Sequence, residues 1–298
     1  GFDPTMPIAL VLHGLNGGSA ESYVLDFVHT STQRKWTCVV LIARGLGGVA
    51  LQSGLPFTGA RTTDVAACID VIAQAAPTTP IVGVGFSMGA IVLANYCGVS
   101  GDANKLSCAI SISGCYDVTT GANVSYMKRV WHPWLTLELK RTFLRILTGS
   151  DSSAAVDFQC HGSSTTQMAS QLIDVDVVLS AVVKTIRDFD YKVIVPLYGY
   201  PTIDKYYADM SLASHGKASR VSTPLLALHA CDDPIADSDA YASVMAAAHP
   251  NLWFLITRRG GHVGWSRGWL PTRHRWSFIH QVVHDFSNAV LAEAAGSF

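Results

Sequence analysis

Residues 80–97 read PIVGVGFSMGAIVLANYC: an apolar run, a serine between two glycines, and a second apolar stretch. The run at 80–86 is short and continuous, which is typical of a strand buried on both faces of a sheet. Gly85, Ser87 and Gly89 fit the G-x-S-x-G pattern, in which a nucleophilic serine stands on a sharp turn between a strand and a helix. The glycines let neighbouring backbone pass close by, because they have no Cβ. We therefore predict a strand, a nucleophile at Ser87 and a helix over 88–98.

Similar apolar runs recur along the chain. They lie at 7–12, 36–42, 106–111, 223–230 and 252–257. Candidate helices lie at 63–75, 236–248 and 273–295. Strands that are continuously apolar and alternate with helices predict a mostly parallel sheet with helices on both faces, the doubly wound α/β architecture.

The alternation of strands and helices stops between about residues 118 and 221. Helical patterns replace it there, and the Ser/Thr/Gln-rich stretch at 148–171 is typical of a flexible loop. We predict three parts: residues 1–117 as the first part of the core, 118–221 as a helical cap insertion, and 222–298 as the second part of the core.

Composition excludes several classes of protein. The chain has 298 residues, of which 49% are hydrophobic and 14% charged, so a disordered chain is excluded. The net charge of -1 provides no basic field for a nucleic acid partner. The seven cysteines lack paired spacing, and no phosphate loop, dinucleotide fingerprint or metal-ligand cluster occurs, so we expect no cofactor and no metal.

A serine nucleophile needs a base, and the base needs an orienting acid. In folds of this kind the chain order is serine, acid, histidine. His262 follows two glycines just after the apolar run at 252–257, and Asp233 follows the run at 223–230. Pro234 fixes a turn directly after Asp233, which favours it as the acid over Asp232. Asp117, after the run at 106–111, is a third candidate.

The oxyanion of an acyl-transfer intermediate needs backbone N–H donors. Met88, directly after the candidate nucleophile, is one candidate. The other is Leu15, in the loop HGLNG that follows the first apolar run.

Taken together, these motifs resemble the α/β-hydrolase family, and within it the type-4 branch of membrane-associated lipases and esterases, which includes the YheT-like esterases. The stretches that carry the resemblance are LVLHGLNGGS (10–19), ARGLGG (43–48), GVGFSMGAIVLANY (83–96), ISISGCYD (110–117), TIRDFD (185–190), YGY (198–200), CDDPI (231–235) and GGHVGW (260–265). The resemblance implies a Ser-Asp-His triad at Ser87, Asp233 and His262, with Leu15 and Met88 as oxyanion donors.

The resemblance also implies a location. Its members begin with an N-terminal hydrophobic anchor and about two strands before the HG loop, and neither precedes residue 7 here. We therefore expect a truncated core with an unpaired sheet edge, from a protein that is membrane-associated at full length and cytoplasmic otherwise. No apolar run reaches the roughly 18 residues of a membrane span. The stretch WLTLELKRTFLRIL at 134–147 mixes apolar and basic residues. An amphipathic helix of this kind either covers the sheet as part of the cap or lies on a lipid surface.

The leading hypothesis is a serine carboxylesterase or lipase that acts on small esters or on lipids such as acylglycerols and phospholipids. One alternative is an alcohol O-acyltransferase, since an acyl-enzyme can pass its acyl group to any well-placed alcohol. A non-catalytic lipid-binding module is the alternative from a different class.

Overall fold

The computed structural model describes residues 3–51, 53–119, 126–148, 175–247, 249–266 and 275–296. Its centre is a six-stranded sheet in the order β2-β1-β3-β4-β5-β6, and every neighbouring pair is parallel. The strands are β1 (Ile8–Leu12), β2 (Thr37–Leu41), β3 (Ile81–Phe86), β4 (Cys108–Ile112), β5 (Leu225–Ala230) and β6 (Leu252–Thr257).

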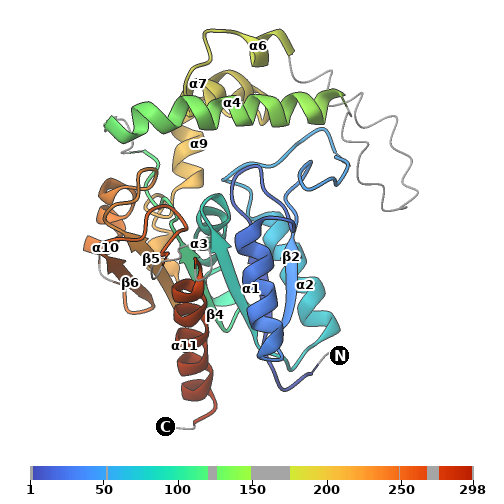
Figure 1. Ribbon diagram of the computed structural model, residues 1–298, viewed down its shortest axis with the longest axis vertical. Coiled ribbons are helices and arrows are strands. Elements are labelled where there is room, and N and C mark those ends of the chain that lie inside the picture. Colours follow the sequence, from blue (N-terminus) through green and yellow to red (C-terminus); the bar gives the residue numbers. More distant parts are fainter. Residues whose placement is uncertain are drawn as a thin grey trace.

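Helices cover both faces of the sheet (Figure 1). The helices are α1 (Ser22–Gln33) and α11 (Ser277–Ala294) on one face, and α2 (Thr63–Ala75) and α3 (Met88–Ser100) on the other. Successive β1 residues alternate between the two layers: Ile8, Leu10 and Leu12 pack with α2 and α3. Ala9 and Val11 pack with α1 and α11. This arrangement confirms the predicted doubly wound α/β class.

The two edge strands differ from the prediction of burial on both faces. The central strands β1, β3, β4 and β5 are buried throughout. In contrast, β2 is half-buried along its whole length, and β6 exposes 58% of Trp253 and 36% of Leu255. The prediction was wrong there because an edge strand has a neighbour on one side only, and a continuous apolar run does not show which strands are edges.

Two helical segments also differ from the prediction. α1 was not predicted, because its sequence has no capping side chain and ends in Ser, Thr and Gln. The helix is stabilised by Val24 and Phe27, which are fully buried against the sheet. The helix predicted over 236–248 is a 3-10 turn (Ser238–Ala240) followed by the short α10 (Ala242–Ala246). Tyr241 interrupts it with a φ of -137°, and its ring packs 4.4 Å from that of His229.

A layer of helices lies beyond the sheet and its covering helices, at the top of Figure 1. It contains α4 (Tyr126–Thr148), α6 (Val175–Leu179), α7 (Ile186–Phe189), a π-helical turn (Asp190–Ile194), α8 (Val195–Leu197) and α9 (Ile203–Met210). The apolar cluster that includes Phe143 and Phe189 also contains Leu46, Leu51 and Phe57 from the loop before α2. The described residues of the layer contain no strand. The limits of the cap at 118 and 221 stay predictions, and residues 149–171 of the predicted loop lie outside the described residues.

The helix predicted over 134–147 is the larger part of α4. Its apolar side chains do not share one face: Phe143 is fully buried, whereas Trp134 is 52% exposed. Phe143 therefore belongs to the interior of the layer, and contact of this helix with a lipid surface stays a prediction. None of the helices in the described parts of the chain is long and apolar enough to cross a membrane.

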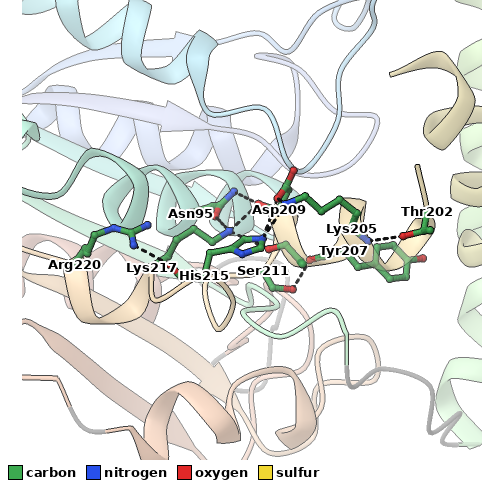
Figure 2. A network of polar contacts seen from close by, with 10 residues as sticks. Asn95, Thr202, Lys205, Tyr207, Asp209, Ser211, His215, Lys217 and Arg220 are labelled. Atoms are coloured by element: carbon green, nitrogen blue, oxygen red, sulfur yellow. Dashed lines mark hydrogen bonds and ion pairs between the residues drawn. The ribbon is translucent and has the colours of Figure 1, made fainter. Parts of the chain in front are cut away.

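A buried lysine ties this layer to the core (Figure 2). Lys217, only 3% exposed, donates through Nζ to Asn95 Oδ1 at 2.6 Å and to the carbonyl oxygens of Asp209 at 2.8 Å and Ala208 at 3.2 Å. Asn95 lies on α3 and donates in turn to the Asp209 carbonyl at 2.9 Å. Burial lowers the pKa of Lys217 to about 8. The end of α9 is thus fixed to α3, the helix that directly follows Ser87.

We expect Lys217→Met to lower the free energy of unfolding by about 1–3 kcal/mol, because the substitution leaves the Asn95 amide oxygen and two carbonyls without their donor. Urea unfolding at pH 7 measures the change. Lys105→Met is the matched control, since Lys105 pairs with Asp70 where both side chains are 52% exposed, and such surface pairs contribute about 0–1 kcal/mol. Equal stability of the Lys217 variant and the wild type would contradict the role of this network.

Candidate active site

Ser87 occupies a strained turn between β3 and α3. Its φ of 52° and ψ of -113° are unfavourable for any residue with a side chain. The turn brings α3 very close to β1 and β3: a Cβ on Gly85 would lie 2.5 Å from the Gly89 carbonyl oxygen, and a Cβ on Gly89 would lie 2.4 Å from the Leu12 carbonyl oxygen. Both positions therefore require glycine, and the serine hydroxyl is presented at the carboxyl end of the sheet.

His262 joins the serine to a carboxylate. Its Nε2 lies 2.8 Å from Ser87 Oγ, and its Nδ1 lies 2.9 Å and 3.0 Å from the two carboxylate oxygens of Asp233. An ionised carboxylate only accepts hydrogen bonds, so Nδ1 carries the proton and Nε2 is free to accept from the serine hydroxyl. The three side chains come from turns after β3, β5 and β6, and the structure brings them into one continuous chain of hydrogen bonds.

Asp233 is held in its ionised form. Its burial tends to raise the pKa, but the hydrogen bond and charge of His262 and the N–H groups of Ala236 and Ile235 outweigh burial, so that the pKa lies below the usual value for an aspartate. Asp233 Oδ1 accepts from these two N–H groups at 2.9 Å and 2.8 Å, respectively. The carboxylate is therefore fixed in position and charged at neutral pH.

The other two candidate acids have different partners. Asp232 Oδ1 accepts from the N–H groups of Gly260 and Gly261, both at 2.8 Å, and so holds the loop that carries the histidine. Asp117 accepts from the Thr119 hydroxyl at 2.5 Å and from the Ser243 hydroxyl at 2.9 Å. Of the three aspartates, only Asp233 is hydrogen-bonded to the imidazole of His262.

The loop after β1 is held by a buried histidine and a tyrosine. Nδ1 of His13 donates to the Gly14 carbonyl at 2.8 Å, and its Nε2 accepts from the Ala43 N–H at 3.1 Å. The Gly14 N–H donates to the Tyr23 hydroxyl at 2.8 Å. Because the Gly14 donor is already engaged, Leu15 remains the candidate oxyanion donor of this loop. Sequence reasoning missed Tyr23, since it lies on the unpredicted helix α1.

A cavity of about 400 Å³ contains Ser87 and His262. The candidate oxyanion residues Leu15 and Met88 also line it. Its apolar wall comes from the layer of helices and from the loop before α2. The apolar lining includes Phe57, Leu139, Phe143, Phe189 and Ile194. Such a cavity suits an apolar ligand.

The parts of the chain that the structure describes hold no group of three or more His, Cys, Asp or Glu side chains that could bind a metal ion.

Comparison with known proteins agrees with this fold. The family model described as "alpha/beta hydrolase fold" matches residues 7–264. Among solved structures, 2,6-dihydroxy-pseudo-oxynicotine hydrolase is similar with a TM-score of 0.57 and 13% identity, and the match covers 98% of this chain and 63% of that one. At this identity the similarity concerns the fold alone.

Two curated relatives are more similar in sequence. A monoacylglycerol lipase of Saccharomyces cerevisiae is 32% identical over 88% of this chain and 56% of its own length. Phospholipase ABHD3 of Mus musculus is 31% identical over 96% of this chain and 64% of its own length. The chain thus spans between about half and two thirds of these relatives.

The neighbouring residues Asp232 and Asp233 provide a test of the geometry. We expect Asp233→Asn to slow the reaction of Ser87 with a fluorophosphonate by about 10³-fold or more, because an amide in place of the carboxylate favours the wrong imidazole tautomer. Asp232→Asn is the matched control, and it should slow labelling by less than about tenfold, since it only loosens the loop. Mass spectrometry of the labelled chain over time measures both rates. A larger loss for Asp232→Asn would contradict the assignment.

Proposed function

The chain belongs to the α/β-hydrolase family, and on that premise we propose that it is a serine hydrolase that cleaves carboxylic esters of lipids. The observation that carries the proposal is the hydrogen-bond chain from Ser87 through His262 to Asp233 at the floor of an apolar cavity. Ser87 is the nucleophile, His262 the base and Asp233 the orienting acid.

In the first half of the proposed reaction, Ser87 Oγ attacks the ester carbonyl carbon and His262 Nε2 takes the hydroxyl proton. The negative charge that develops on the carbonyl oxygen is stabilised by the N–H groups of Leu15 and Met88. Asp233 stabilises the imidazolium. His262 then donates its proton to the alcohol oxygen, the carbon–oxygen bond breaks, and the alcohol leaves an acyl group on Ser87.

In the second half, water replaces the alcohol. His262 takes a proton from the water while the water oxygen attacks the acyl carbon. The N–H groups of Leu15 and Met88 again bind the oxyanion. The bond to Ser87 Oγ breaks as His262 returns the proton to it. One ester and one water give one carboxylic acid and one alcohol.

Two observations support a lipid ester as the substrate. The cavity wall is largely apolar, so an acyl chain can be buried there at a gain of about 0.8 kcal/mol for each CH₂ group. The two relatives are named for the hydrolysis of a monoacylglycerol and of phospholipids.

The outer surface of α4 supports binding at a lipid surface. Val130, Trp134 and Leu137 are 53%, 52% and 45% exposed, and their spacing places them on one side of the helix. Trp134 also lines the cavity of Ser87, and the exposed Arg141 and Arg145 follow on the same helix. We propose that this exposed group of apolar side chains lies on an anionic lipid surface beside the cavity, with the two arginines near the headgroups.

Ser87→Ala should abolish hydrolysis of p-nitrophenyl decanoate, with a loss in kcat of about 10⁴-fold or more, because the acyl-enzyme is formed on Ser87 Oγ. Release of p-nitrophenol measures the rate, and circular dichroism shows whether the fold is kept. Ser219→Ala, at an exposed serine of the 3-10 turn Ala218–Arg220, is the matched control and should retain full activity. A Ser87 variant that keeps wild-type activity would refute the mechanism.

Replacing Val130, Trp134 and Leu137 together by serine should weaken binding to vesicles of anionic phospholipid by about tenfold or more, because the apolar area that enters the lipid is lost. Co-sedimentation with the vesicles measures the bound fraction. Val71→Ser is the control, since Val71 is 65% exposed on α2, on the core. If wild type and triple variant sediment equally, α4 does not provide the contact.

A further inference from the structure

Asp190 is a carboxyl group in the wall of the apolar cavity. It is the first residue of the π-helical turn Asp190–Ile194, is 7% exposed, and lines the same cavity as Ser87. Burying a carboxyl group costs free energy unless it is hydrogen-bonded. π-helical turns are rare and are found frequently at functional sites. Both features call for a reason that packing alone does not give.

The hydrogen bonds of Asp190 leave one oxygen unused. The Tyr207 hydroxyl donates to Oδ2 at 3.1 Å, and among the residues that the structure describes Oδ1 has no hydrogen-bond partner. The nearest cation, Arg187, lies over the Tyr207 ring at 5.5 Å and pairs with Asp204 at 3.6 Å. Burial raises the pKa of Asp190 to about 7. Near neutral pH the group can therefore donate or accept a hydrogen bond at Oδ1.

Asp190 also stands where two cavities adjoin. A second cavity of about 200 Å³ also has Asp190 in its wall, and the two cavities share Ile91, Ile186, Asp190, Met210 and Ile235. The side chains of Arg187 and Tyr207 line the second cavity but not the first. Asp190 therefore belongs to the walls of both cavities, and the second cavity adds the polar side chains of Arg187 and Tyr207.

We propose that Asp190 determines specificity for the alcohol part of the ester, by hydrogen bonding to a hydroxyl group that this part carries. The proposal rests on the ester hydrolysis proposed above. Esters of polyols are then preferred to esters of simple alcohols with the same acyl chain, because only the polyol brings a further hydroxyl group to the Asp190 carboxyl group. A site built to bond a hydroxyl group discriminates strongly against a substrate that lacks it.

The alternative is that Asp190 serves only to anchor Tyr207 within the layer of helices. Tyr207→Phe separates the two roles. It removes the hydroxyl that donates to Asp190 Oδ2 and leaves the carboxyl group itself in place. A purely structural role predicts the same consequences for Tyr207→Phe and Asp190→Leu.

The test compares 1-decanoylglycerol with propyl decanoate, which share the acyl chain and a three-carbon alcohol and differ in two hydroxyl groups. The quantity measured is the ratio of kcat/KM for the two esters, and this ratio does not depend on how much of a preparation is folded. We expect Asp190→Leu to lower the ratio at least tenfold, mainly by raising KM for the glycerol ester, with all rates given per labelled serine. Asp190→Asn, which retains an amide able to bond a hydroxyl, should restore the ratio to within about threefold, and Tyr207→Phe should leave it unchanged.

Three results would overturn the proposal. The first is a wild-type enzyme with no preference for the glycerol ester. The second is an Asp190→Leu variant that loses activity equally on both esters, and the third is a Tyr207→Phe variant that loses the preference as fully as Asp190→Leu does. Failure of wild type to hydrolyse either ester would instead refute the proposed function, and with it this inference.

Discussion

The close approach of α3 to β1 is the contact on which the rest of the site depends. A Cβ on Gly89 would lie 2.4 Å from the Leu12 carbonyl oxygen and 2.6 Å from that of His13, so helix and strand can touch only through a glycine. This contact brings the strained turn at Ser87 beside the loop that holds Leu15. The candidate nucleophile and the candidate oxyanion donors are therefore positioned by one backbone contact, and side-chain packing elsewhere has only to preserve it.

The parallel sheet accounts for the remaining members of the site. In parallel strands all carboxyl ends lie at one edge, so the turns after β1, β3, β5 and β6 meet there although they are distant in sequence. Each turn then needs only local hydrogen bonds to aim its side chain. Ile235 and Ala236 hold Asp233 through their N–H groups, and Asp232 holds the loop before His262.

Much of this could be predicted from the sequence, and the failures have physical causes. The central strands were predictable because burial on both faces makes them continuously apolar, and Ser87 because only glycines fit around its turn. The helix α1 was not predictable, since it has no capping side chain and is stabilised by the burial of Val24 and Phe27 against the sheet. Asp190 could not be identified, because a carboxyl group in a helical segment normally faces solvent and only the folded cavity shows that this one does not.

The helix α3 has a double role that relates the nucleophile to the helical layer. Its first turn follows Ser87, and Asn95, two turns further on, bonds to the Asp209 carbonyl and to Lys217. Asp209 belongs to α9, which also contains Tyr207, the partner of the Asp190 carboxyl group. A single rigid helix thus fixes the distance between the serine and the wall that contains Asp190. Because this wall lies at a fixed distance from the nucleophile, it can select a substrate by the positions of the polar groups that the substrate carries. A wall whose distance from Ser87 varied could not select in this way.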